Sequence, residues 1–344
     1  MGFFQELNVE QKQHLNLSIK AQTIIRDDMV AFGINSMSGI LNQVISCFKD
    51  VADASIYERI TEKKESLLNI FSDYSHVDRE KIISRILSNC ENELKLKSSN
   101  YESGKGIKFR INNENMEFLT SKELCKEDTY YDSLGKYIKA LIEEYSGKSF
   151  FDREEIIKKE IIETIVSSIH SENQIKIALT DGKIIVLKPY KITSDELRDN
   201  HYLLGILVPN DERLYQNVIS VRISSINAVH ILRRNGHISK EKKDLIENEE
   251  ATKGVPFIGK KLIQVKVQFS KKGEKNYRRI TNLRPSYLSK DKGVYTFFCS
   301  EEQAKFYFFR FGKEAKILEP KILAEHMRTE HQKAANMYEM MGEI

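Results

Sequence analysis

Residues 175–187 read IKIALTDGKIIVL, and this stretch decides the fold of the middle of the chain. Two short apolar-rich runs flank the turn residues at 180–182, Thr-Asp-Gly, which is the pattern of a β-hairpin. Further short strands are predicted at 202–207 and 218–223. A helix over 152–169 precedes them, with an apolar stripe at every fourth residue. A helix followed by several short antiparallel strands is therefore expected here.

The first fifty residues show a different pattern. The stretch 14–20, HLNLSIK, alternates apolar and polar residues as a strand does, and it is followed by a helix that ends at Gly33. Serines at 36 and 38 can begin a second helix. This order resembles a ribbon-helix-helix module, in which two copies pair their strands, so a homodimer is expected. The polar face of the ribbon, which could enter a DNA major groove, is Asn16, Ser18 and Lys20.

The charge of this segment also allows a second interpretation, in which the module does not bind DNA. Residues 1–54 hold 4 basic and 6 acidic residues, whereas binding to DNA depends on neutralising phosphates. The module could therefore serve dimerisation alone. Residues 55–150 carry helical patterns and are interpreted as a helical connector.

The C-terminal third carries most of the positive charge. Residues 253–344 contain 19 basic and 10 acidic residues, and the excess lies mainly in 253–292, with 12 basic and 2 acidic residues. A basic block on a folded domain favours a polyanionic partner. Strands are predicted at 261–269 and 295–299, with helices at 301–309 and 320–338. The polar, charged stretch 235–254 before them is interpreted as a linker.

Several short motifs occur in a fixed order along the chain. They are Lys188-Pro189-Tyr190, His201-Tyr202-Leu203-Leu204-Gly205, Val221-Arg222-Ile223-Ser224-Ser225-Ile226, Phe306-Tyr307-Phe308-Phe309-Arg310-Phe311-Gly312 and Ala315-Lys316-Ile317-Leu318-Glu319-Pro320. Together, over about residues 160 to 338, they resemble the bacterial WYL-domain proteins with a C-terminal extension. The resemblance implies an α+β chain with a small Sm-like β-barrel. The expected boundaries are 1–54 for the ribbon-helix-helix module, 55–150 for the connector, 151–235 for the WYL domain and 255–344 for the extension.

The resemblance also points to a binding site on the barrel. His201 stands where the family has tryptophan, Tyr202 matches the family residue, and Arg222 matches the first arginine of a late strand. Ser225 stands where a second arginine is usual, which weakens the expected pocket. The neighbouring candidates are Lys188 and Tyr190.

A second candidate surface follows from the basic block. Basic residues interleaved with aromatic ones suit a groove that follows a nucleic-acid backbone. The members of this group are Lys271, Lys272, Arg278 and Arg279, with Lys275, Arg284, Tyr277 and Tyr287 beside them.

The sequence offers no sign of catalysis. It lacks a P-loop, a dinucleotide-binding glycine motif, an HExxH pair and a GxSxG elbow, so an enzyme is not expected, nor is a metal or a cofactor. The four cysteines are scattered and are interpreted as reduced thiols of a cytoplasmic protein. No apolar run is long enough for a membrane span.

Two functions from different classes fit these observations. The combination of modules is similar to the WYL accessory proteins of type VI-D CRISPR systems, which implies single-stranded RNA binding that enhances an RNA-guided nuclease. The alternative is a ligand-responsive transcription regulator that binds operator duplex DNA through the ribbon-helix-helix module.

Overall fold

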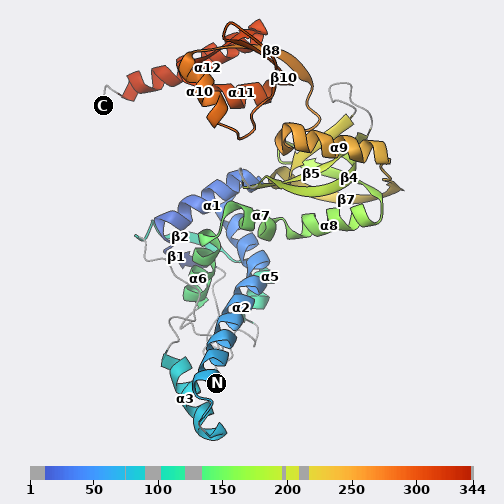
Figure 1. The fold of residues 1–344 in the computed structure, drawn as a ribbon. Coiled ribbons are helices and arrows are strands. Elements are labelled where there is room, and N and C mark those ends of the chain that lie inside the picture. Colours follow the sequence, from blue (N-terminus) through green and yellow to red (C-terminus); the bar gives the residue numbers. More distant parts are fainter. Residues whose placement is uncertain are drawn as a thin grey trace.

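The computed structural model describes residues 12–73, 75–89, 102–120, 134–195, 199–208 and 217–341. The chain has a mixed α+β fold, as the sequence predicts. Its elements gather into an N-terminal body, a central sheet and a C-terminal module, which follow one another in chain order (Figure 1). None of the helices in the described ranges has the length and apolar character that a membrane span needs.

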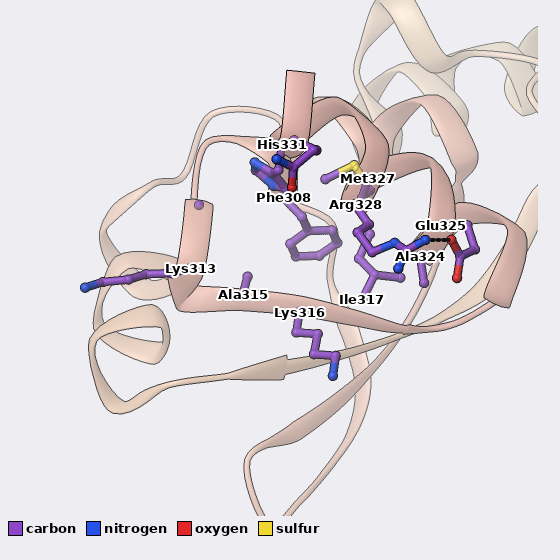
Figure 2. Close-up of a pocket in the computed structure, with 12 residues that line it drawn as sticks. Phe308, Lys313, Ala315, Lys316, Ile317, Ala324, Glu325, Met327, Arg328 and His331 are labelled. Carbon is purple, nitrogen blue, oxygen red and sulfur yellow. Dashed lines mark ion pairs between the residues drawn. The ribbon is translucent and has the colours of Figure 1, made fainter. Parts of the chain in front are cut away.

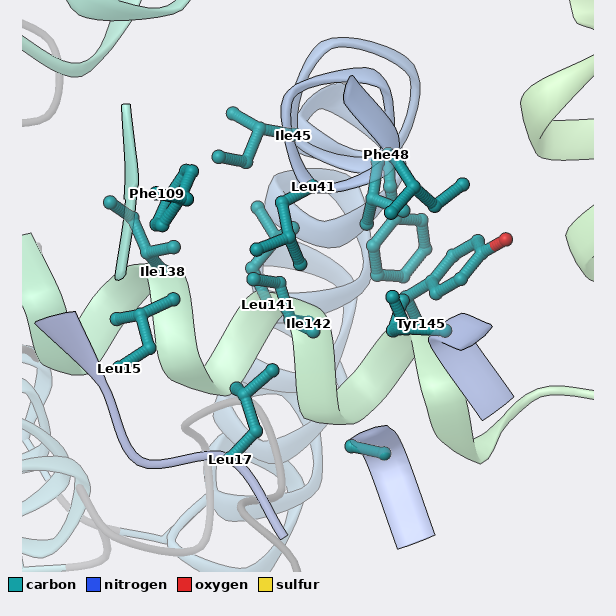
Figure 3. Packing of buried hydrophobic residues seen from close by; sticks show 14 of the residues in the cluster. Leu15, Leu17, Leu41, Ile45, Phe48, Phe109, Ile138, Leu141, Ile142 and Tyr145 are labelled. Atoms are coloured by element: carbon teal, nitrogen blue, oxygen red, sulfur yellow. The ribbon is translucent and has the colours of Figure 1, made fainter. Parts of the chain in front are cut away.

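The N-terminal body is mostly helical. Its elements are β1 (Lys12–Leu15), α1 (Ile19–Phe32), α2 (Met37–Ile70), α3 (His76–Asn89), β2 (Ile107–Arg110), α5 (Asn113–Thr120) and α6 (Leu134–Gly147). Figure 3 shows its core, where apolar residues of α2 and α6 meet residues from β1 and β2. Phe48 packs edge-on against Tyr145, with ring centres 5.9 Å apart. This core therefore draws on residues from both sides of position 54.

The predicted strand over 14–20 is wrong in its extent. β1 ends at Leu15 and pairs antiparallel with β2 of the same chain. Ser18 begins α1 instead, because its hydroxyl accepts a hydrogen bond from the Ala21 amide and so caps the helix. The predicted helix end at Gly33 and the predicted cap at Ser36 are confirmed.

The central sheet has five antiparallel strands. They are β3 (Asn173–Leu179), β4 (Ile184–Asp195), β5 (Asn200–Val208), β6 (Val218–Arg222) and β7 (Ile226–Asn235), in the order β6-β5-β4-β3-β7. The helices α7 (Phe150–Ile157) and α8 (Lys159–His170) precede them, and α8 packs through Ile165 on one face of the sheet.

This sheet is curled but open. Its edge strands β6 and β7 are joined directly by η2 (Ile223–Ser225), so the two edges have to approach one another. Within the described ranges, however, no ladder of hydrogen bonds pairs β6 with β7. The expected Sm-like barrel is therefore seen as an open sheet and not as a closed barrel.

The stretch interpreted as a linker is a docked helix. α9 (Lys240–Lys253) lies over the second face of the sheet, opposite α8 (Figure 1). Ile246 of α9 is fully buried in a cluster with Tyr202 and Leu204 of β5. Leu245 and Ile246 are the large apolar residues of this charged helix, and two adjacent residues were too weak a pattern to predict this packing from sequence.

The C-terminal module contains a second sheet. Its elements are β8 (Leu262–Phe269), α10 (Lys271–Arg279), β9 (Tyr287–Asp291), β10 (Val294–Ser300), α11 (Glu301–Phe309), β11 (Ala315–Glu319) and α12 (Lys321–Met341). The strand order is β11-β8-β10-β9. The predicted strands at 261–269 and 295–299 and the two late helices are confirmed. The basic stretch after Phe269, for which no helix was predicted, is helical in α10.

Candidate nucleic-acid interface

Two of the predicted site residues lie side by side on the central sheet. Tyr202 of β5 and Arg222 of β6 are direct cross-strand partners in the antiparallel ladder. The guanidinium carbon of Arg222 lies 6.0 Å from the centre of the Tyr202 ring. Because Tyr202 is buried while Arg222 is exposed, the arginine presents its charge to solvent over an aromatic support. A charged, planar group held in this way can contact a phosphate or stack on a base.

Two hydroxyl groups on the same face have no hydrogen-bond partner in the described part of the chain. Ser220 lies two residues before Arg222 on β6, so both side chains point to one side of the sheet. The hydroxyl oxygens of Tyr202 and Ser220 are buried, and neither forms a hydrogen bond within the described part of the chain. A buried polar group without a partner is costly to stability, and the burial of both hydroxyl oxygens also keeps them from direct contact with a ligand at the surface.

Acidic residues of α9 cover the neighbouring candidates on β4. Tyr190 donates a hydrogen bond of 2.8 Å to Glu247, and Lys191 lies 2.9 Å from the same carboxylate and 2.7 Å from that of Glu250. The hydroxyl of Thr193 donates to Glu250 at 2.8 Å. The hydrogen bond from Lys191, and after it the one from Tyr190, hold the pKa of Glu247 below its usual value. The helix therefore places two carboxylates where a polyanion would contact β4.

Lys191, Glu247 and Glu250 were not predicted as part of the site. The only sequence signal was the charge run in 240–250, which does not reveal that the helix folds back on the sheet. Lys188 was predicted, and its Nζ donates to the carbonyl oxygen of His237 at 3.0 Å. It thus ties β4 to the segment that leads into α9.

His201 faces the interior and not the candidate surface. Its Nδ1 lies 2.8 Å from Oε2 of Glu154, its Nε2 lies 3.1 Å from Oε1 of Glu155, and its ring stacks on Phe151 with centres 3.7 Å apart. The fully buried Glu154 also accepts hydrogen bonds from the backbone amides of His201 and Ser224, each at 2.7 Å. His201 thus joins α7 to the sheet, and the structure does not offer its ring to a base.

The second predicted surface lies on α10. The hydroxyl of Ser270 accepts from the Gly273 amide and caps this helix, and Gly273 and Tyr277, four residues apart, form its buried face. The remaining turns carry exposed cations: Lys271, Lys272, Lys275, Arg278 and Arg279. We call these five residues the α10 cations.

The α10 cations have no acidic partners in the described ranges, where none of them forms an ion pair. Other lysines of this module do have such partners. Lys290 lies 3.1 Å from Glu274, and Lys305 lies 2.6 Å from Glu301. Unpaired positive charge on a rigid helix produces a strong local potential, which is the electrostatic requirement for binding a phosphate backbone.

The residues predicted to face a groove on the N-terminal ribbon do not share one strand face. Ser18 is buried, and both its amide and its hydroxyl donate to Glu143, at 2.6 and 2.7 Å. Asn16 lies after the end of β1, and Lys20 is exposed on α1. The predicted groove-facing set is therefore wrong for Ser18, because that residue serves as a helix cap.

A cavity of about 730 Å³ lies in the C-terminal module between α12 and β11 (Figure 2). Its apolar lining includes Phe308, Ile317 and Met327. Arg328 at its side is paired with Glu325 at 3.0 Å, and Figure 2 shows Lys313 and Lys316 pointing away from one another. His331 and Gln332 also line the cavity, so its wall carries polar as well as apolar residues.

Metal and thiol chemistry find little support in the described ranges. No group of three or more histidine, cysteine, aspartate or glutamate side chains there could hold a metal ion. Cys47 and Cys299 are free thiols, and burial raises the pKa of Cys47 to about 11 and that of Cys299 to about 12. Cys90 and Cys125 lie outside the described residues.

Comparisons with known proteins give a neighbour of the whole fold. No family model matches the chain, and no curated protein does. The crystal structure of a CRISPR Cas-related protein superposes with a TM-score of 0.67 at 23% identity, over 96% of this chain and 94% of that one. Proteasome accessory factor B/C (PafBC) of Arthrobacter aurescens aligns with a TM-score of 0.30 at 13% identity, over 97% of this chain and 51% of that one. The chain therefore has the fold of a known CRISPR Cas-related protein along nearly its full length.

Proposed function

We propose that this chain is a non-catalytic accessory protein that binds single-stranded RNA and enhances an RNA-guided CRISPR nuclease. The observation that carries the binding proposal is the set of α10 cations, which are exposed, held on one short helix and unpaired within the described ranges. Such a set is suited to the phosphates of a nucleic acid.

The central sheet supports the choice of a single strand. The exposed guanidinium of Arg222, held above the Tyr202 ring, offers a planar charged group on which an unpaired base can stack. Base edges and faces are accessible in this way in single strands and not in an A-form duplex. The resemblance to WYL-domain proteins, carried here by Tyr202 and Arg222, agrees with a ligand site at this position.

The role in a CRISPR system is inferred from the fold. A CRISPR Cas-related protein has the same architecture over 94% of its own length, although 23% identity reports on the fold alone. A chain with that architecture and no recognisable catalytic motif fits an accessory or regulatory role. The alternative, operator DNA bound by an N-terminal ribbon, loses support because Ser18 is buried and bonded to Glu143.

The test is a comparison of single-stranded RNA with duplex DNA of the same length, by fluorescence anisotropy at several salt concentrations. Replacing Lys271, Lys272, Arg278 and Arg279 with alanine should reduce the slope of log K against log salt by about 0.7 for each RNA phosphate that the variant no longer neutralises. A matched control replaces Lys183 and Lys333, which are paired with Asp181 and Glu330. Unchanged RNA binding in the α10 variant would contradict the proposal, as would a preference for duplex DNA.

Enhancement of a nuclease needs its own assay. The chain is added to an RNA-guided nuclease of a type VI-D CRISPR system, and the initial rate of RNA cleavage is measured. We expect the rate to rise with the wild-type chain and to rise less with the α10 variant. If the cleavage rate rises equally with the wild-type chain and with the α10 variant, enhancement of the nuclease does not depend on RNA binding by α10.

A further inference from the structure

The C-terminal sheet has a simple topology with one covered face. Its elements follow the order β8-α10-β9-β10-α11-β11, which is a β-α-β-β-α-β arrangement, and β8 and β10 are the two central strands. All of its described helices contribute to one core, against the inward residues Val265 and Val267 of β8 and Phe297 of β10. The helical residues in that core are Tyr277, Tyr307, Phe308, Leu323 and Met327.

The opposite face of the sheet carries no helix in the described ranges. Successive side chains of a strand point to opposite faces, so the residues between the buried ones lie together on this second face. They are Gln264, Lys266 and Gln268 of β8, Thr296 and Phe298 of β10, and Lys316 of β11. We call this set the open face.

Phe298 is the feature of the open face that the fold does not explain. It lies on a central strand directly opposite Gln264, and its side chain is 51% exposed. The aromatic residues that stabilise the module, such as Phe269, Tyr295 and Phe297, pack against one another on the covered face. A large aromatic side chain exposed in the middle of a sheet is therefore available for contact with another molecule.

We propose that the open face is a second contact site for single-stranded nucleic acid, with a base stacked on Phe298. This inference rests on the proposed RNA-binding function and adds a site that the WYL motif and the α10 cations do not include. Four-stranded sheets commonly bind single-stranded RNA by stacking bases on aromatic side chains of the exposed face. The geometry here offers the same elements in one place.

The neighbours of Phe298 suit this ligand. Gln264 and Gln268 are exposed and can donate and accept hydrogen bonds at base edges. Lys316 is exposed and forms no ion pair within the described part of the chain, and Lys266 is paired with Glu319 at 2.9 Å, so both place positive charge at this face. The surrounding segment 253–344 carries a net charge of +9, which favours a polyanion over an acidic-rich or neutral partner.

The test compares a variant that lacks the aromatic ring of Phe298 with a variant that keeps an aromatic ring at this position. Phe298→Ala should weaken binding of a single-stranded RNA by about 10-fold, since stacking on an aromatic residue commonly contributes that much per base. Phe298→Tyr should bind within about 2-fold of the wild type, because it keeps the aromatic face. Phe306→Ala is the matched control, since Phe306 is 44% exposed on α11 and outside the open face.

Crosslinking gives a second readout that does not depend on affinity. An RNA that carries 4-thiouridine is irradiated with the full chain, and the crosslinked peptides are mapped by mass spectrometry. We expect a crosslink within β10, and its loss in the Phe298→Ala variant. Binding that survives in Phe298→Ala without a crosslink in β10 in the wild type would overturn the inference and leave the proposed function standing.

Two other outcomes would be equally clear. If the wild-type chain binds no single-stranded RNA, the proposed function and this inference both fail. If Phe298→Ala turns a dimer into a monomer by light scattering and leaves RNA binding unchanged, the open face is an interface between two copies, and the inference is wrong.

Discussion

Asp28 is a buried charge with two partners from elements distant in the sequence. Its carboxylate lies 2.8 Å from Nε and 3.0 Å from Nη2 of Arg153, and it accepts a hydrogen bond of 2.8 Å from Tyr145. Burial, and then the negative charge of Asp28, hold the pKa of Tyr145 above its usual value, so the phenol stays a donor.

Removing this carboxylate should therefore destabilise the N-terminal body. Asp28→Ala leaves Arg153 charged and buried, which costs about 3–5 kcal/mol. Urea denaturation followed by circular dichroism measures the change. Asp27→Ala is the control, because Asp27 is exposed on the same helix. A loss below about 1 kcal/mol would show that Arg153 finds another partner.

Lys158 gives a prediction with a defined pH window. The residue is 4% exposed, its Nζ donates to the carbonyl of Ile226, and burial lowers its pKa from 10.5 to about 8. Between these two values the unfolded chain holds a proton that the folded chain has lost. The free energy of unfolding therefore rises with pH in this window, by at most about 3 kcal/mol.

The comparison is between the wild type and Lys158→Met. Below the window both folded and unfolded Lys158 are charged, so the difference between the two chains is constant. As the pH rises through the window, the free energy of unfolding of the wild type should increase by about 2 kcal/mol relative to that of the variant. Lys159→Met, at an exposed neighbour, should show no such change. A constant difference for Lys158→Met would mean that its pKa is not lowered.

At the scale of elements, α9 lies against the proposed binding surface of the central sheet. Glu247 and Glu250 repel a polyanion and occupy Tyr190 and Lys191. Replacing both with glutamine should strengthen RNA binding by about 2- to 5-fold, the range that partly exposed ion pairs support. Anisotropy measures this change, and Glu241→Gln, on the exposed side of α9, is the control. Weaker binding in the double variant would show that α9 orders the site instead.

Local patterns predicted the elements that are local. The turn at 180–182, the cap at Ser36 and the end of α1 at Gly33 depend on residues within a few positions. The extent of β1 was predicted wrongly because its partner, β2, lies about ninety residues away, and the periodicity of a local segment does not reveal such a partner. α10 was missed because only Gly273 and Tyr277 face its core, so a charged helix carried almost no apolar pattern.

The candidate site was predicted in part for the same reason. The strand pattern and the family motif pointed to Tyr202 and Arg222, which the structure places opposite one another. The motif could not show that His201 turns inward, because its partner Glu154 comes from a helix 47 residues earlier. The acidic residues of α9 were equally hidden, since docking of that helix depends on the sheet beneath it.

At the scale of the whole molecule, α7 joins two bodies. Arg153 pairs with Asp28 of the N-terminal body, and the next residue, Glu154, bonds to His201 and Ser224 of the central sheet. Glu154→Gln should uncouple the two bodies and split one calorimetric transition into two. Glu163→Gln, at an exposed residue of α8, should not. Two transitions already present in the wild type would contradict this coupling.

The homodimer stays a prediction, but the N-terminal strand no longer supports it. Leu15 of β1 and Leu17, which follows this strand, are buried within a single chain, so neither residue requires a second copy to cover it. Exposed apolar residues occur instead on α12, where Ile322 and Tyr338 are about four-fifths exposed. Light scattering should give the mass of two chains, and a single-chain mass at high protein concentration would contradict the prediction.

The long helix α2 affects how that mass has to be measured. Its 34 residues span roughly 50 Å, and its second half projects with α3 away from the rest of the chain (Figure 1). An arm of this kind raises the frictional coefficient and slows diffusion. On a sizing column even a single chain would elute early, at the volume of a heavier sphere, and its sedimentation coefficient would be low for its weight.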